Sequence, residues 1–210
     1  MTDYSAAHRV LDQLGYTDYI INPGKKSLRI EKITLDENNN YLLDILEGFE
    51  TIEGDLEFHN FEHENFNCLN GLKTVRVIKI VNNNKVKSIS GFSSLSKIRS
   101  LIIEKNTSLE SITGFGNLFI SQSRVPGNIK IVNNKLLTSI SFLRGLKNVG
   151  LSLYLHHNSL DSLEGLEDLK SIGASFSLSS NKLVSLKSLS KLKQIGGMLG
   201  LVNNQLTSQP

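Results

Sequence analysis

Cysteine is almost absent from this sequence. Its 210 residues include a single cysteine, Cys68, so the chain can close no internal disulfide and can supply no four-cysteine zinc site. A secreted scaffold held together by disulfides is therefore excluded. Hydrophobic residues make up 39% of the chain. We expect the fold to be stabilised by burial of these side chains.

Long apolar runs and a large charge surplus are also lacking. No run approaches the roughly 18 residues of a membrane-spanning helix, and residues 1–25 have no apolar stretch behind a basic start. We expect no membrane span. These features favour a cytoplasmic protein, or one delivered without a cleaved signal peptide, over a disulfide-bonded extracellular one. A net charge of +3 is too small to indicate a nucleic-acid partner.

Motifs typical of enzymes are missing. The sequence has no GxxxxGK[ST] phosphate loop, no GxSxG elbow and no HExxH zinc motif. His59, His63 and Cys68 lie close together in the sequence, as do His156 and His157, but neither spacing is diagnostic of a metal site. We therefore expect a protein that is not an enzyme, with no catalytic residues, no cofactor and no metal.

The sequence does contain an internal repeat of about 23 residues. Each unit has two apolar residues with one residue between them, then two further residues, then asparagine. Weaker copies at Asn38 and Phe61 extend the series to eight units, starting near Leu28. Six asparagines occupy the equivalent position: Asn83, Asn106, Asn134, Asn158, Asn181 and Asn204.

Each repeat unit predicts one short strand and a tight turn. The apolar pair before asparagine has the period of two that a strand with one buried face requires. Leu183, Leu186 and Leu189 then recur every third residue, which favours turns or short 3₁₀ segments over a long α-helix. We expect the asparagines to stack at the turns, where their amides bond to backbone groups that are otherwise buried without partners.

Several of these units resemble leucine-rich repeats, most closely the receptor L-domain variety. The residues that carry the resemblance lie in Phe49–Phe58, Leu146–Leu153 and Leu163–Gly173. The resemblance implies a repeat solenoid, a right-handed leucine-rich-repeat or L-domain-like coil. It would have one parallel β-sheet, short strands, turn or 3₁₀ segments and an N-terminal capping helix. Such a sheet would serve as a recognition surface.

The domain organisation expected from these patterns is a single unit. Residues 1–27 form a capping helix and linker, and residues 28–210 form the eight coils. Four apolar residues lie on one face of the predicted helix, which ends at Gly15: Ala7, Val10, Leu11 and Leu14. That face either covers the first coil or docks onto a partner. The step from Asn106 to Asn134 is five residues longer than usual, and the surplus at Phe119–Gly127 is either a tolerated surface loop or part of a binding site.

The predicted strands place two columns of side chains on the outer face of the sheet. Their middle members mix apolar and charged residues, which is typical of a protein-contact surface. We therefore predict a non-catalytic module that recognises a protein or peptide through this face. The alternative is a structural or self-associating protein that joins copies at the C-terminal edge Met198–Val202. The expected partner-binding residues are Lys79, Val81, Ile102, Glu104, Lys130, Val132, Tyr154 and His156.

Overall fold

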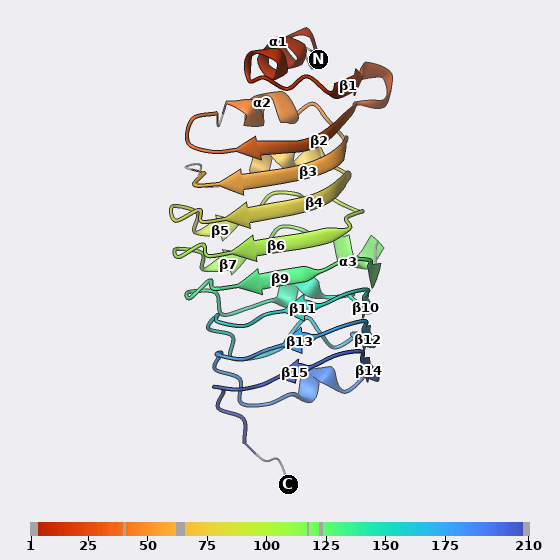
Figure 1. Cartoon of the computed structure of the whole chain (residues 1–210). Helices are drawn as coiled ribbons and strands as arrows, with labels where there is room; N and C mark the ends of the chain where they lie inside the picture. Colours follow the sequence, from red (N-terminus) through yellow and green to blue (C-terminus); the bar gives the residue numbers. More distant parts are fainter. Residues whose placement is uncertain (1–3, 40, 62–65, 117, 122–123, 208–210) are drawn as a thin grey trace.

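The structure, a computed structural model, describes residues 4–39, 41–61, 66–116, 118–121 and 124–207. A nine-stranded sheet runs through these residues from the N-terminal end to the C-terminal end (Figure 1). In spatial order its strands are β1 (Tyr19–Asn22), β2 (Ser27–Leu35), β3 (Thr51–His59), β4 (Thr74–Val81), β6 (Ser100–Glu104), β9 (Ile129–Val132), β11 (Leu153–Tyr154), β13 (Phe176–Ser177) and β15 (Leu199–Gly200).

Two smaller sheets and several short helices complete the described fold. The four-stranded sheet has the order β14 (Gln194–Ile195), β12 (Ser171–Ile172), β10 (Asn148–Val149) and β8 (Arg124–Val125). The two-stranded sheet pairs β5 (Ser88–Ile89) with β7 (Ser111–Ile112). The helices are α1 (Tyr4–Gln13), α2 (Leu42–Leu46), α3 (Leu118–Ser121) and the 3₁₀ segments η1 (Pro23–Lys25), η2 (Asn67–Gly71), η3 (Ser141–Leu143) and η4 (Lys187–Leu189).

The predicted fold class, a leucine-rich-repeat solenoid with one parallel sheet, is wrong. The structure is a mixed α/β fold with a mostly parallel sheet of nine strands, two further sheets and few helices. One of the nine strands, β1, is the exception and pairs antiparallel with β2. It arises because Asn22, Pro23 and Gly24 form a tight connection that ends at Lys26, whose φ is +47°. The sequence predicts only a capping helix and a linker for residues 1–27, so this strand is a further difference.

The parallel strands nevertheless pair residues that lie 22 to 28 positions apart. Leu56 on β3 is opposite Ile78 on β4, which is opposite Leu101 on β6. Leu101 in turn is opposite Ile129 on β9. All four side chains are fully buried. Equivalent apolar side chains therefore lie one above another, and they form a single core along the length of the sheet.

The asparagines do stack as expected. Asn134 accepts a hydrogen bond on its Oδ1 from the Asn106 backbone N–H (3.1 Å), and its amide nitrogen donates to Ile103 O (3.0 Å) and Val132 O (3.1 Å). In the same way, Asn106 Oδ1 accepts a hydrogen bond from the Asn83 backbone N–H, and Asn158 Oδ1 accepts one from the Asn134 backbone N–H. Each of these side chains is at most 8% exposed. One amide therefore satisfies backbone groups of more than one segment.

Glycines set the closest approach between segments at one edge. A Cβ added to Gly173 would lie 2.1 Å from the carbonyl oxygen of Gly150, and one added to Gly196 would lie 2.1 Å from that of Gly173. No side chain fits such a gap. Gly173 N–H also donates to Val149 O (2.9 Å). The glycines therefore permit the backbone pairing that continues into the four-stranded sheet.

The predicted N-terminal helix is confirmed as α1. It lies at the N-terminal end of the sheet (Figure 1), and its Ala7 and Leu11 are buried in the core. Within the described residues no helix is long and apolar enough to cross a bilayer.

The inserted segment contributes to the core. It contains α3 and β8, while residues 122–123 lie outside the described part. Phe119 and Val125 are at most 1% exposed. The surplus residues are therefore more than a surface loop.

Candidate functional site

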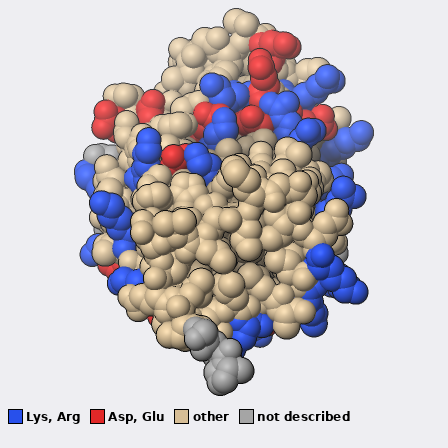
Figure 2. Space-filling view, turned by 60° about the horizontal axis from the view of Figure 1, so that its bottom comes forward, with Lys and Arg blue, Asp and Glu red and all other residues tan. Residues whose placement is uncertain are grey.

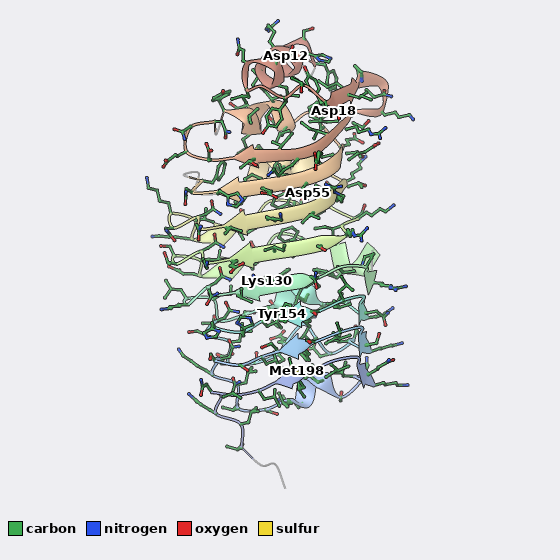
Figure 3. The ribbon with its side chains drawn as sticks, viewed as in Figure 1. Asp12, Asp18, Asp55, Lys130, Tyr154 and Met198 are labelled. Carbon is green, nitrogen blue, oxygen red and sulfur yellow. The ribbon has the colours of Figure 1, made fainter. Side chains whose placement is uncertain are left out.

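The structure brings the predicted partner-binding residues together on neighbouring strands. Lys79, Ile102, Lys130 and Tyr154 are directly opposite one another on β4, β6, β9 and β11. Val81, Glu104 and Val132 form a second row, and His156 follows Tyr154 by two residues. Figure 3 labels Lys130 and Tyr154, which lie on adjacent strands in the middle of the sheet. We call the members of the two rows that are only half-buried, together with His156, the sheet-face site.

Val132 is the exception, and its predicted role in partner contact is wrong. Its side chain is fully buried, so it offers no surface to a partner. Larger residues flank it, Glu104 on β6 and His156 just after β11. Strand alternation places Val132 in the same row as Glu104, but it does not predict that larger neighbouring side chains shield the valine from solvent.

Both lysines of the sheet-face site are paired with carboxylates. Lys130 Nζ lies 2.5 Å from Glu104 Oε2. Lys79 Nζ lies 2.5 Å from Oε1 of Glu57, whose Oε2 lies 3.1 Å from Nε2 of His59. The pairs hold their members in fixed positions.

Two titratable groups in this region have shifted pKa values. Burial raises the pKa of Glu57, but hydrogen bonds from Lys79 and His59 outweigh burial and bring it below the usual value. Burial, followed by the neighbouring His157 and Lys130, lowers the pKa of His156. The shift favours the neutral form of the His156 ring, whose Nδ1 lies 2.8 Å from Nδ1 of His157.

The apolar part of the sheet-face site consists of Val81, Ile102 and Tyr154, all half-buried. The ring of Tyr154 contacts the ring of His156 edge-on, with 6.1 Å between their centroids. The positions in register beyond Tyr154 are Ser177 and Gly200, which carry little side chain. Tyr154 is thus a large aromatic side chain next to positions of the sheet that carry only small side chains.

Two residues considered as metal ligands have other surroundings. The ring of His59 is hydrogen-bonded to the carboxylate of Glu57. Burial raises the pKa of the Cys68 thiol to about 11. His63 lies outside the described residues. Within the described residues, no three His, Cys, Asp or Glu side chains come together as a metal site would require.

Comparison of the chain with models of known protein families gives no match, and comparison with curated proteins gives none. The resemblance to leucine-rich repeats therefore stays a prediction.

Removing Lys79 should destabilise the fold because it leaves a buried carboxylate with one partner fewer. Glu57 is 7% exposed. We expect Lys79→Met to lower the free energy of unfolding at pH 7 by about 1–3 kcal/mol, and Glu57→Gln in the same chain to restore part of it. Urea unfolding measures both changes.

The matched control is Lys191→Met, which removes an ion pair on the surface. Asp168, the partner of Lys191, has a side chain that is 41% exposed. We expect this variant to lose less than about 1 kcal/mol. Equal losses in the two lysine variants would contradict the assignment of Glu57 as a carboxylate that depends on Lys79.

Proposed function

We propose that the protein is a non-catalytic recognition module that binds a protein or peptide through the sheet-face site. The observation that carries the proposal is the row formed by Ile102, Lys130 and Tyr154, in which a half-buried aliphatic and an aromatic side chain flank a paired cation. Aromatic side chains with apolar neighbours are the groups that contribute most to binding energy at protein interfaces.

The arrangement favours binding because little of it has to be ordered. The side chains project from strands of one continuous sheet, and Lys130 and Lys79 are already fixed by their carboxylate partners. A surface that is ordered before association loses less conformational entropy on binding. The charged residues around Ile102 and Tyr154 would then select the orientation of the partner.

A non-catalytic role is supported by how the ionisable groups are used. Glu57 and Glu104 are engaged with lysines, and the ring of His156 is against His157 and Tyr154. Among the described residues of this face, no acid or base stands beside a nucleophile at hydrogen-bond distance, as acid–base or covalent catalysis requires.

The proposal predicts that a partner captured by the protein is lost when the row is altered. Ile102→Glu with Tyr154→Ala should reduce capture at least about tenfold, because the variant removes the aromatic anchor and places an unpaired charge in the contact. Affinity capture at moderate salt, quantified by mass spectrometry, measures the effect.

The control is Val184→Glu, at a residue that is 49% exposed and outside the two rows. Circular dichroism checks the fold of each variant. Capture that is equal for the wild type and the Ile102/Tyr154 variant would remove the sheet-face site from consideration.

A second candidate function is self-association through Met198–Val202. Met198 is 79% exposed and Val202 69% exposed. β15 is the last strand of its sheet in the described part of the chain. Met198 O and Gly200 O already accept hydrogen bonds from the backbone N–H groups of Phe176 and Leu178, in and just after β13. The backbone groups of Leu199 and Leu201 therefore face away from β13, as at an edge that pairs with another strand. Figure 2 shows an uncharged area around this end.

Self-association predicts a sedimentation coefficient that rises with protein concentration. Met198→Lys with Val202→Lys should keep the protein monomeric, because two lysines would meet their copies in the contact. Leu136→Lys with Val184→Lys, at exposed apolar residues elsewhere, should associate like the wild type. A wild-type protein that stays monomeric at the highest concentrations measured would exclude this candidate.

A further inference from the structure

A groove of about 860 Å³ lies at the beginning of β3 and β4. It is separate from the sheet-face site, because it uses Thr74–Arg76 at the start of β4 whereas that site uses Lys79 and Val81 at its end. Its lining comes from four successive segments of the chain and consists of Ile52, Glu53, Thr74, Val75, Arg76, Ser96, Lys97, Ile98, Arg99 and Pro126.

The floor of the groove is aliphatic. Ile52 and Val75 are opposite each other on β3 and β4, and Val75 N–H donates to Lys97 O (3.2 Å), which brings Ile98 alongside. These three side chains are at most 2% exposed and are held by the core, so the apolar surface open to a ligand comes from the exposed Pro126 and from the aliphatic parts of the charged side chains.

The inserted segment forms one end of the groove. Pro126 lines it, and the next residue, Gly127, donates its N–H to Arg99 O (2.8 Å). A Cβ on Gly127 would lie 2.7 Å from the same oxygen, so the two backbones are in close contact. The lengthened step between Asn106 and Asn134 thus closes off a concave surface.

The rim of the groove carries three cations and one carboxylate. Arg76 is held by Asp55, with Nε 2.6 Å from Oδ1, and by Glu31 O at 3.0 Å. Lys97 and Arg99 are exposed, and neither forms an ion pair with another described residue. This differs from the sheet-face site, where Lys79 and Lys130 each have a carboxylate. Unpaired cations above an aliphatic floor complement a ligand with carboxylates next to an apolar group.

We propose that this groove binds an extended acidic peptide segment of about four or five residues, with one apolar side chain between carboxylates. Four successive segments at the usual strand spacing of about 4.8 Å span about 15 Å, which an extended chain covers at about 3.3 Å per residue. The apolar side chain lies against the exposed Pro126 and the aliphatic parts of Arg76 and Lys97, and the carboxylates pair with Lys97 and Arg99. The proposal stands independently of the function assigned to the sheet-face site.

The lining favours a peptide over a nucleic acid. Single-stranded nucleic acids bind to aromatic side chains on which bases stack, with cations that follow the phosphates. The groove offers aliphatic side chains instead, and none of the residues that line it is aromatic.

The proposal is tested with a fluorescein-labelled peptide of sequence Asp-Glu-Leu-Asp-Glu and the full chain, by fluorescence anisotropy at two salt concentrations. We expect saturable binding that weakens with salt. Lys97→Glu with Arg99→Glu should weaken it at least about tenfold. The matched control, Lys135→Glu with Lys182→Glu, changes the net charge by the same amount at exposed lysines outside the groove and should keep the wild-type affinity.

Further probes separate the alternatives. The peptide with serine in place of leucine should bind more weakly, and the peptide with asparagine and glutamine in place of its acids should not bind. Equal weakening by the two double variants would mean that net charge alone attracts the peptide and would overturn the proposal. So would the absence of binding at millimolar peptide, or tighter binding of a single-stranded oligonucleotide that Lys97 and Arg99 also control. Circular dichroism confirms that each variant is folded.

Discussion

The structure depends on buried asparagine amides that bond to the backbone of neighbouring segments. An amide buried without partners would be costly, and so would the backbone groups at each turn. Asn106, Asn134 and Asn158 satisfy both needs, because each oxygen accepts a backbone N–H from the preceding asparagine and each nitrogen donates to backbone carbonyls. This requirement fixes the position of each segment on the one before it and therefore the register of the sheet.

Core and surface follow from that register. Inside, aromatic rings lie in contact from segment to segment: Phe66 and Phe92 are 5.7 Å apart, and Phe92 and Phe115 are 4.9 Å apart and nearly parallel. Outside, the same register places Lys130 between Ile102 and Tyr154. A rigid core and a fixed row of surface side chains thus have one cause, and both proposed binding surfaces rest on it.

The sequence predicts best what recurs in it. The asparagine positions and the rows around Lys130 follow from a spacing that can be counted, and α1 follows from the periodicity of Ala7 and Leu11. The antiparallel strand β1 was missed because a turn at Pro23 predicts a change of direction but not its pairing. The burial of Val132 depends on the neighbouring side chains across strands, which alternation does not contain. The cations of the groove could have been found in the sequence, since Arg76 and Arg99 each follow an apolar residue at equivalent positions of the repeat. The concave shape could not be predicted, because it depends on where Pro126 lies.

The central claim is tested most directly by the free energy of unfolding of Asn134→Ala and Asn204→Ala. Both side chains accept one backbone N–H and donate to two backbone carbonyls, and Asn134 also bonds to the side-chain amides of Asn106 and Asn158. Asn134 is fully buried, whereas water reaches Asn204. Buried groups left without partners cost about 1–3 kcal/mol each, so we expect Asn134→Ala to lose at least about 2 kcal/mol and Asn204→Ala clearly less. Equal and small losses at both positions would contradict the account.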